Sequence, residues 1–377
     1  MIASSLRSPA AIPDCSDREP VSSFLRPSKP GKTHPALITG AGGSIGSSIA
    51  QSFARFAFGG SVYQLILLDH SEQNLYEVRS FHSSPGDISI LGDVSDDALL
   101  DELFSKYRPE TIYHAAAFKH VPLMEENPIA AIRNNILGTW TLALAAIQYK
   151  TQKLVMVSTD KAADPRSIMG ATKRVAELIL SCLDSPETRM RSLRLCNVLR
   201  STGSVVPLFE RQIRMGGPVT VTHPDASRYF ITLHEATDLI LSMNDVDDSG
   251  TLFVPELDAP VKIADLARKM IAEAAESNPK QIKIVAIGLR PGEKLSENLI
   301  SSSETVEPTA KPNLRHVNGP IPTVETLSSA IGIISEKVQA RDLPALIEVI
   351  RSLVPEYKPS EALTALASAQ LSATAKA

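Results

Sequence analysis

The chain has 377 residues and a nearly balanced charge, with 38 Lys and Arg against 42 Asp and Glu and a formal net charge of −4. That length is enough for one large domain or two modest domains with a sizeable core. The balance of charges argues against a protein that coats nucleic acid, whose signature is a basic stripe. We therefore expect no nucleic-acid partner.

The cysteines show neither a disulfide framework nor the spacing of a zinc site. There are three of them, Cys15, Cys182 and Cys196, and they are widely separated. We therefore expect no metal. A reduced, cytoplasmic protein is the simpler interpretation.

No apolar run approaches the ~18 residues that a membrane-spanning helix needs. The most apolar long stretch, residues 130–147, is interrupted by Arg133 and two asparagines. The first residues are rich in Ser and Pro and lack the continuous apolar core of a signal peptide. We expect a flexible segment over residues 1–34 and no membrane span.

From residue 35 onward, short β-type runs alternate with helical segments. The runs are branched and apolar, as expected of parallel strands covered on both faces. Between them, apolar residues recur at spacings of three and four, as in Ile45, Ile49 and Phe53. This alternation predicts βαβ units in an α/β fold, a Rossmann-type doubly wound parallel sheet. The predicted strands are residues 36–40, 63–69, 88–94, 111–117 and 153–159.

The regular alternation of predicted strands and helices ends after Asn197. Short β-like pieces, such as residues 218–223 and 251–256, are mixed with helices, notably one predicted over residues 261–275. This mixture predicts a smaller C-terminal lobe, with some of its segments returning to the main sheet.

A glycine-rich turn joins the first predicted strand to the first predicted helix. In LITGAGGSIGSSIAQSF, Gly40, Gly43 and Gly46 have the spacing G-x-x-G-x-x-G. Such a turn lets the backbone approach a pyrophosphate, and the N-terminus of the following helix offers it N–H groups and the positive end of a dipole. Ordinary tight turns also use glycines, so the context decides. We expect a dinucleotide to bind at Gly40, Gly43, Ser44, Ile45 and Gly46.

The next strand supplies that context. It ends at Asp69, 23 residues after the last glycine of the turn, where a carboxylate can accept the ribose hydroxyls of a dinucleotide. His70 and Ser71 follow, with no Arg or Lys to neutralise a 2′-phosphate, so NAD is favoured over NADP as the cofactor. Asp93, which lies with Val94 at the end of the third strand, either reaches an adenine amino group or caps the next helix.

Three polar stretches follow the carboxyl ends of strands, where open α/β sheets bind their ligands. In the first, His114 ends a strand, and the small side chains of Ala115 and Ala116 leave room for a flat ring. Lys119 and His120 come next. We expect Ala115, Ala116 and Lys119 at the cofactor, and Lys119 and His120 at the substrate. A solvated Lys–His pair is the alternative.

The second stretch, VSTDK, brings Ser158, Thr159, Asp160 and Lys161 to a strand end. A hydroxyl, a carboxylate and an ammonium at this edge offer a proton donor and a proton acceptor side by side. Their mutual electrostatics would also tune their pKa values. The alternative interpretation is an ion pair in a loop.

One turn of the next helix carries Met169 and Lys173 on the same face. A large class of nicotinamide enzymes has a Tyr and a Lys at this spacing. A thioether cannot take a proton from an alcohol, so Met169 implies that the proton work is done elsewhere. Thr159, relaying through water, is our hypothesis for the missing base.

The third stretch runs from Asn197 through GGPVT to Arg228, and Arg290 follows in GLRPGEKL. A guanidinium matches phosphate oxygens in a bidentate manner, although a single arginine is more often structural. Two arginines in a chain that already holds a dinucleotide suggest a substrate with its own pyrophosphate, a nucleotide sugar.

These stretches together resemble the extended short-chain dehydrogenase/reductase superfamily. More narrowly, they resemble the nucleotide-sugar 4,6-dehydratases of the capsular polysaccharide and flagellin-glycan group, which act on UDP-N-acetylglucosamine. Many relatives also have an N-terminal membrane region, and the resemblance covers their catalytic part alone. The motifs that carry it are TGAGGSIGS, HAAAFKHVPLMEENP, NNILGT, STDKAADPRSIMGATKR, GSVVPLFERQI, GGPVTVTHPDASRYF and GLRPGEKL.

The resemblance implies a three-step reaction on a UDP-sugar with NAD. The sugar is oxidised at carbon 4, water is eliminated across carbons 5 and 6, and hydride returns to carbon 6. The product is a 4-keto-6-deoxy sugar nucleotide. Met169, where another branch keeps Tyr and inverts carbon 5, implies that this chain retains the configuration there.

The resemblance also implies roles for individual residues. Lys161 is the base at carbon 5, Asp160 the acid at carbon 6, and Thr159 bonds the oxygen on carbon 4. Lys173 holds the nicotinamide ribose, with Asn135 among the cofactor residues. The implied substrate-binding residues are Lys119, His120, Asn197, Val205, Thr220, Arg228, Arg290 and Glu293, with the two arginines on the UDP diphosphate.

The chain departs from the family pattern near the sugar pocket. Leu195-Cys196 stands where Phe-Gly is common, residues 200–203 read Arg-Ser-Thr-Gly instead of Gly-Ser-Arg-Gly, and Ser296 replaces an aromatic residue. Two alternatives therefore stay open. One is a nucleotide-sugar 4-epimerase or dehydrogenase on the same fold, and the other is a catalytically silent NAD-binding module.

The expected domain division follows from the motifs. A Rossmann domain that binds NAD(P) covers residues 35–200, and a substrate-binding lobe covers 201–345. A C-terminal helix and flexible tail cover 346–377. We expect a homo-oligomer, a dimer or higher, in which helices over 129–149 and 167–183 pair across the interface as in relatives.

Overall fold

The structure is a computed structural model that describes residues 33–56, 62–81, 86–246, 250–275 and 282–374. Of the segment expected to be flexible, only Thr33 and His34 lie among the described residues, and both belong to the first strand.

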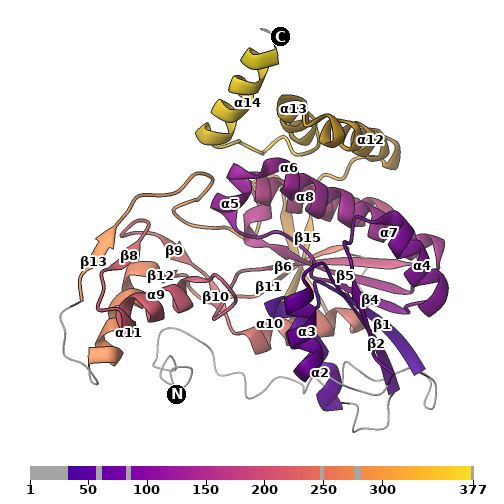
Figure 1. Ribbon diagram of the computed structural model, residues 1–377, viewed down its shortest axis with the longest axis horizontal. Helices are drawn as coiled ribbons and strands as arrows, with labels where there is room; N and C mark the ends of the chain where they lie inside the picture. The colour runs from indigo at the N-terminus through magenta and orange to yellow at the C-terminus, as the bar shows by residue number, and fades with distance from the viewer. Residues whose placement is uncertain (1–32, 57–61, 82–85, 247–249, 276–281, 375–377) are drawn as a thin grey trace.

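A nine-stranded sheet in the order β14-β15-β11-β6-β5-β4-β1-β2-β3 forms the centre of the molecule (Figure 1). The strands from β3 to β11 run parallel, and β15 and β14 are added antiparallel at one edge. The predicted doubly wound α/β fold is confirmed. The strands are β1 (Thr33–Thr39), β2 (Val62–Asp69), β3 (Ile88–Leu91), β4 (Thr111–His114), β5 (Lys153–Thr159), β6 (Arg189–Leu195), β11 (Leu252–Pro255), β14 (Thr305–Pro308) and β15 (Leu314–Asn318).

Helices cover both faces of this sheet, which explains why strands such as β2 are almost entirely apolar. Side chains alternate along β2, where Ile66 and Leu68 enter one core while Leu65 and Leu67 enter the other. All four are at most 1% exposed. One face carries α4 (Asp97–Tyr107), α7 (Gly138–Gln148) and α8 (Ile168–Leu183), and the other carries α2 (Ser44–Phe56), α3 (Glu72–Phe81) and α10 (Leu233–Ser242) (Figure 1).

The helix predicted over residues 129–149 is interrupted by a π-helical turn. It consists of α6 (Pro128–Ile132), the π-turn η3 (Arg133–Leu137) and α7. The extra residue of a π-turn is often found at functional sites. Here it brings Asn135 to the interior, where the side chain is 1% exposed.

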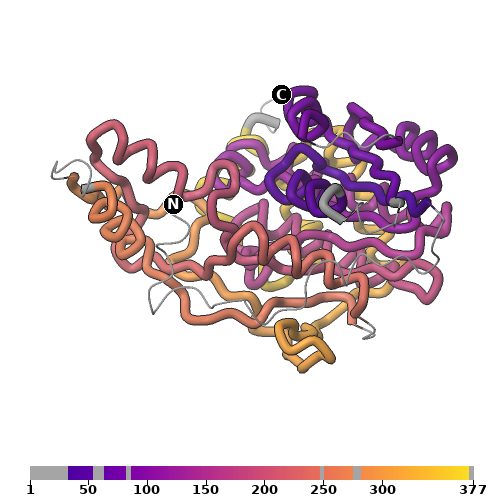
Figure 2. The backbone as a smooth tube through the Cα atoms, turned by 90° about the horizontal axis from the view of Figure 1, so that it is seen from below, coloured from indigo at the N-terminus to yellow at the C-terminus, as the bar shows by residue number. Residues whose placement is uncertain are grey.

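A smaller lobe with its own apolar core lies at one end of the main domain (Figure 2). Val206 and Phe209 on α9 pack with Leu266 and Met270 on α11 in this core. Its elements are α9 (Val205–Arg214), β8 (Val219–Val221), β9 (Ser227–Arg228), β12 (Val261–Lys262), α11 (Ile263–Ala275) and β13 (Ile284–Ala286). Between the two parts lies a short parallel pair, β7 (Asn197–Val198) and β10 (Phe230–Ile231).

The C-terminal part of the chain differs from the expected division. Three helices, α12 (Val324–Ala340), α13 (Leu343–Leu353) and α14 (Glu361–Thr374), lie above α8 and α6, on the main domain (Figure 1). The expected boundary between residues 345 and 346 therefore falls inside α13. The reason is packing: Leu327, Ile334 and Leu346 belong to the same core as α7 and α8.

These helices close α8 off from the surface. Its residues from Ile168 to Leu180 are all buried within the chain. This corrects the expectation that the helix over 167–183 pairs with a second copy, because α8 has no exposed face to offer.

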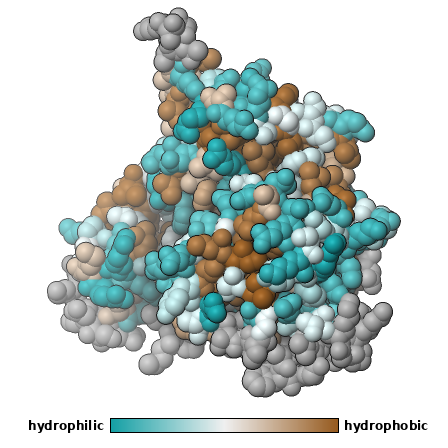
Figure 3. All heavy atoms as spheres, turned by 45° about the vertical axis from the view of Figure 1, so that its right-hand side comes forward, coloured by the Kyte–Doolittle hydropathy of each residue, from teal (hydrophilic) through white to brown (hydrophobic). Residues whose placement is uncertain are grey.

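On the face drawn in Figure 3, apolar atoms gather in patches among polar side chains, and α14 projects at the top.

None of the helices in the described part of the chain is long and apolar enough to cross a membrane.

The contact between the C-terminal helices and the main domain can be tested with one buried leucine. Leu346 is 0% exposed, so Leu346→Ala should leave a cavity and lower the free energy of unfolding by about 3 kcal/mol. Leu366, which is 46% exposed on α14, is the matched control and should change it by less than about 0.5 kcal/mol. Denaturant unfolding measures both, and equal effects would contradict the packing described.

Candidate active site

The glycine-rich turn is as tight as its sequence predicts. Gly40 has a φ of +66°, and a Cβ there would lie 2.7 Å from the backbone of Ala115 and Ala116. A Cβ on Gly46 would lie 2.2 Å from the carbonyl oxygen of Gly40. The helix α2 begins at Ser44, directly after the turn, so its first N–H groups face the space beyond β1. The turn, the start of α2 and the end of β4 thus form a cradle without side chains.

Asp69 lies at the tip of β2 beside this cradle. Its carboxylate accepts hydrogen bonds from the backbone N–H of Gly42 and of Ser71, both at 2.9 Å, and the residue is 5% exposed. These bonds fix the carboxylate next to the turn. Asp93 accepts bonds from Ser95 and does not cap α4, because Asp96 is the cap.

Two polar side chains behind the cradle, those of His114 and Asn135, form hydrogen bonds within the protein. His114 bonds to Thr39 at 2.7 Å and to Thr139 at 3.0 Å, and burial next to Lys173 lowers its pKa to about 3. The ring is therefore neutral at working pH.

The side chain of Asn135 links the loop after β4 to α8. Its amide bonds both the N–H and the carbonyl of Phe118, and it donates to Thr172 on α8 at 3.0 Å. The π-turn thus holds the loop after β4 against the helix that carries Lys173.

The polar residues at the carboxyl end of β5, Thr159, Asp160 and Lys161, form one hydrogen-bonded group. Lys161 Nζ donates to Asp160 Oδ1 at 2.8 Å and to Asn197 Oδ1 at 3.3 Å, and the hydroxyl of Thr159 donates to the same Asp160 oxygen at 3.0 Å. Asp160 is 0% exposed, and its Oδ2 has no hydrogen-bond partner within the described residues. One carboxylate oxygen is thus held by the protein and the other is unused.

The charge of Lys161 depends on two carboxylates. Burial alone would lower the pKa of Lys161, but Asp160 and Glu297 more than offset this and raise it above its usual value. Lys161 is therefore protonated, and its contact with Asp160 is an ion pair.

Lys173 and Met169 lie one turn apart on α8, both almost fully buried. Burial lowers the pKa of Lys173 to about 8, although Glu177 one turn further opposes the shift. Met169 is 2% exposed and belongs to the main apolar core. It supplies packing at the position where a hydroxyl is usual.

Arg228 is held by backbone rather than by side chains. It is 8% exposed and donates to the carbonyls of Ser227, Lys294 and Leu295 at 2.7–2.9 Å. Glu297 lies 3.9 Å from its guanidinium and 3.3 Å from Lys294 Nζ. Near Lys161, the positive charge of Arg228 and the negative charge of Glu297 therefore act in opposite directions on the pKa of Lys161.

The rim of the site carries the remaining charges. Arg290 pairs with Glu293 at 2.5 Å and is half exposed. Burial lowers the pKa of Lys119, with Lys161 adding to the shift, and the pKa of His120 falls because of burial, Lys119 and Arg290. The charge of Lys161 thus affects the pKa of Lys119, which in turn affects the pKa of His120 at the rim.

Two expected substrate residues lie further out, in the small lobe. Val205 begins α9 and packs against the core of that lobe. Thr220 on β8 exchanges hydrogen bonds with Gln212, at 2.8 and 3.0 Å. The structure does not bring their side chains into contact with the Asp160–Lys161 pair.

The departures at residues 196 and 200–203 lie in contacts that the structure describes. Arg200 adopts a φ of +61°, which is the conformation that favours glycine, and pairs with Glu210 at 3.0 Å. Thr202 bonds to Ser44 at the start of α2, through both its N–H and its hydroxyl. Cys196 is buried beside Asp160, and burial raises the pKa of its thiol, which makes it unreactive.

Sequence reasoning missed Glu297, Lys294 and Glu177. The first two lie in GEKLSE, where charged residues at three- and four-residue spacing read as a solvated surface. Glu177 lies one turn beyond Lys173. A charge on the apolar face of a helix that the pattern buries is the signal that points to it. In the residues that the structure describes, no group of three or more His, Cys, Asp or Glu is arranged to hold a metal ion.

Residues 36–318 match the family described as polysaccharide biosynthesis protein. The chain belongs to this family. The match covers the whole sheet except its first residues and stops before α12. It confirms the resemblance that the motifs indicate.

Individual relatives agree with the family. The capsular polysaccharide biosynthesis protein CapD of Staphylococcus aureus is 44% identical over 275 residues, which are 71% of this chain and 45% of CapD. This chain therefore spans about half the length of CapD. A UDP-glucose 4-epimerase of Rickettsia rickettsii is 32% identical over 71% of this chain and 78% of its own length.

Among solved structures, Pen from Bacillus thuringiensis has a TM-score of 0.70 and 30% identity. The alignment covers 78% of this chain and 91% of Pen.

The cradle can be tested by filling it. In Gly46→Ala the new methyl group would meet the Gly40 carbonyl, so we expect the affinity for NAD to fall at least tenfold, about 1.4 kcal/mol. Gly332, exposed on α12 with nothing within 4 Å of its Cβ position, is the control, and Gly332→Ala should stabilise the protein by roughly 0.5–1 kcal/mol without changing NAD affinity. Calorimetric titration measures the binding. Unchanged affinity in Gly46→Ala would remove the cradle as the cofactor site.

Proposed function

We propose that the protein is a nucleotide-sugar 4,6-dehydratase that uses NAD and acts on a UDP-sugar, with UDP-N-acetylglucosamine as the first candidate. The observation that carries the proposal is the contact at 2.8 Å between buried Asp160 and partly buried Lys161, at the carboxyl end of β5. Elimination needs an acid and a base that face the same edge of one substrate, and this pair supplies both groups.

The residues of the cradle fit a dinucleotide. It has no room for a Cβ at Gly40 or Gly46, it faces the N-terminus of α2, and Asp69 is held beside it. Bound NAD would accept hydride from carbon 4 of the sugar and return it to carbon 6. Asp69 would accept the ribose hydroxyls, and Lys173 would hold the nicotinamide ribose.

The elimination step assigns one proton to each member of the pair. Lys161 removes the proton on carbon 5, which the ketone at carbon 4 makes acidic. Asp160 gives a proton to the oxygen on carbon 6, whose bond to carbon breaks as water departs. Thr159, bonded to Asp160, is close enough to hold the oxygen on carbon 4.

The ion pair seen in the ligand-free chain holds the proton on the wrong partner for this step. A base needs neutral Lys161 and an acid needs protonated Asp160, so one proton must cross the 2.8 Å contact first. A sugar that excludes water from the site favours this transfer, because low polarity penalises charged groups. After elimination Lys161 is charged and Asp160 ionised. Lys161 then returns its proton to carbon 5 as carbon 6 is reduced, and the proton that the carbon 4 hydroxyl released on oxidation, relayed by Thr159 through water, brings the pair back to its starting charge.

The second charged cluster suits the diphosphate of the substrate. Arg228 is fixed by three backbone carbonyls and acts as a stationary positive charge. Arg290 is half exposed and paired only at the rim with Glu293, so it can exchange that partner for a phosphate oxygen. Asn197, already bonded to Lys161, would link the two ends of the substrate site.

Met169 supports retention of configuration at carbon 5. With no hydroxyl at this position, Lys161 is the only proposed group that removes and returns the proton on carbon 5. It acts from one side of the sugar, so the configuration is kept.

Separate substitutions of the acid and the base test the reaction. In Asp160→Asn, release of water from UDP-N-acetylglucosamine should fall by about 10²–10⁴-fold, whereas exchange of the hydrogen on carbon 5 in deuterated water should persist because Lys161 remains. In Lys161→Met both should be lost. Mass spectrometry follows water loss and NMR follows the exchange.

The control for these variants is Glu210→Gln, which removes only the charged partner of half-exposed Arg200. It should keep the wild-type rate. Full water loss in Lys161→Met would contradict the assignment of the base.

The epimerase of Rickettsia rickettsii, 32% identical, favours one other candidate, a 4-epimerase. An epimerase oxidises carbon 4 but needs no acid–base pair for elimination. A product of unchanged mass from wild-type protein would support that candidate and overturn the dehydratase.

A further inference from the structure

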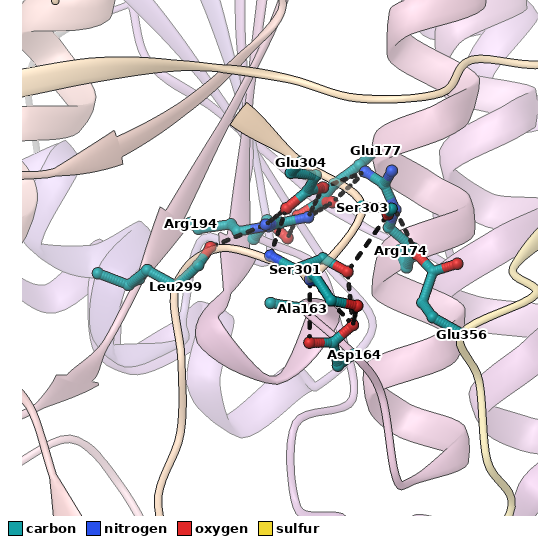
Figure 4. Close-up of polar contacts among 12 residues, drawn as sticks. Ala163, Asp164, Arg174, Glu177, Arg194, Leu299, Ser301, Ser303, Glu304 and Glu356 are labelled. Carbon is teal, nitrogen blue, oxygen red and sulfur yellow. Dashed lines mark hydrogen bonds and ion pairs between the residues drawn. The ribbon is translucent and has the colours of Figure 1, made fainter. Parts of the chain in front are cut away.

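Behind the Asp160–Lys161 pair, a completely buried arginine joins three segments of the chain (Figure 4). Arg194 on β6 is 0% exposed, and all five of its N–H donors are used. It forms bidentate pairs with Glu177 on α8, at 2.7 and 2.8 Å, and with Glu304, at 2.7 and 2.8 Å. The fifth bond goes to the carbonyl of Leu299 at 2.8 Å.

Glu177 connects this cluster to the proposed catalytic residues in two directions. Its Oε1 accepts a bond of 2.6 Å from the hydroxyl of Ser158, the residue directly before Thr159. It also lies one turn from Lys173 on the same face of α8. A single carboxylate therefore contacts β5, which ends directly before Asp160, and raises the pKa of Lys173 against the effect of burial.

Glu304 holds the cluster from the opposite side. It belongs to the loop at residues 299–304, and that loop also binds the segment after Lys161, because Ser301 donates to Asp164 at 2.6 Å. Arg174 adds a second positive charge, 3.1 Å from Glu177 and 3.2 Å from Glu304. Arg174 also lies 3.6 Å from Glu356, so each buried charge of the cluster has at least one partner of opposite sign.

We propose that Glu177 is a positioning residue. Through Ser158 it fixes the segment that carries Asp160 and Lys161, and through its charge it keeps Lys173 protonated, while Arg194 and Glu304 hold it in place. The first half of this role rests on the proposed dehydratase activity, and the second half does not.

The second half of the proposal, the effect of the Glu177 charge (the charge half), can be measured at Lys173 alone. The groups that act on it within the described residues are Glu177 on α8 and His114 on β4, and His114 is neutral at working pH because its pKa is about 3. Asp160 and Lys161 at the end of β5 form a pair of their own. Removing the charge of Glu177 should therefore lower the pKa of Lys173 further below its present value of about 8.

The experiment compares wild type with Glu177→Gln, Ser158→Ala and Glu304→Gln. Lys173 is titrated by NMR of protein labelled with ¹³C at the lysine Cε, and Lys173→Arg assigns its signal. We expect Glu177→Gln to lower the pKa of Lys173 by roughly one unit. Glu304→Gln, which removes the other carboxylate of the same cluster, should leave it unchanged although the protein loses thermal stability.

Ser158→Ala tests the first half of the proposal, in which Glu177 positions the segment that carries Asp160 and Lys161 (the placement half). It removes only the bond between β5 and Glu177, so folding and the charge near Lys173 stay the same. Its kcat for water loss from UDP-N-acetylglucosamine should fall about tenfold, with KM changed less than about threefold, because the pair is misplaced while the substrate site is intact.

Three results would overturn the proposal: an unchanged Lys173 titration in Glu177→Gln, an equal shift in Glu304→Gln, or a wild-type kcat in Ser158→Ala. If the wild type releases no water from the sugar, the proposed function fails together with the placement half. The titration then still decides the charge half. If Glu177→Gln does not fold, Glu177→Asp keeps the charge but withdraws it from Ser158, and it should lower kcat without moving the titration.

Discussion

A guanidinium without any contact to water links the parts of this protein that must stay in register. Arg194 has five donors in one plane, and the fold provides an acceptor for each of them. Because the geometry of a guanidinium is rigid, β6, α8 and the loop at 299–304 cannot shift independently without leaving a buried charge unpaired. The placement of the proposed acid–base pair follows from this constraint, since β5 is bonded to the same glutamate.

The rest of the site is arranged around the carboxyl edge of the parallel sheet. The glycine turn after β1 and the end of β4 approach so closely that side chains are excluded, and the free space is left to a ligand. At the carboxyl end of β5 the reverse holds, because charged side chains there pack against each other. In the proposed function, such a division leaves the binding of a phosphate-rich molecule to backbone groups and proton transfer to the titratable side chains.

The sequence predicts the central part of this architecture well and its periphery poorly. It predicts β5 with the same bounds, residues 153–159, because an apolar run there ends abruptly in polar residues. It does not reveal the π-turn at Arg133–Leu137, since one inserted residue hardly alters the apolar pattern of a helix. Nor does it reveal where α12 and α13 pack, because periodicity identifies an apolar face but not its partner.

The candidate site divides in the same way. Gly40, Asp69, Asp160 and Lys161 are predictable because each follows a strand end or a glycine spacing with a known chemical purpose. Glu177, Glu297 and Arg194 are not, because a charged side chain in sequence reads as solvated, and only tertiary packing shows that these three are buried. The contribution of distant residues to a site is the information that a linear pattern lacks.

The segment between α13 and α14 has a consequence for the loop that precedes α8. The backbone N–H of Lys358 bonds to Pro165, Ser360 bonds to Glu125, and Glu125 in turn accepts the N–H of Ile168 at the start of α8. The loop between the acid–base pair and α8 is thus held partly by residues that leave the ribosome almost two hundred positions later. Loss of these bonds would leave the start of α8 without this support, whereas the close contacts of the glycine turn with Ala115 and Ala116 do not depend on the C-terminal residues.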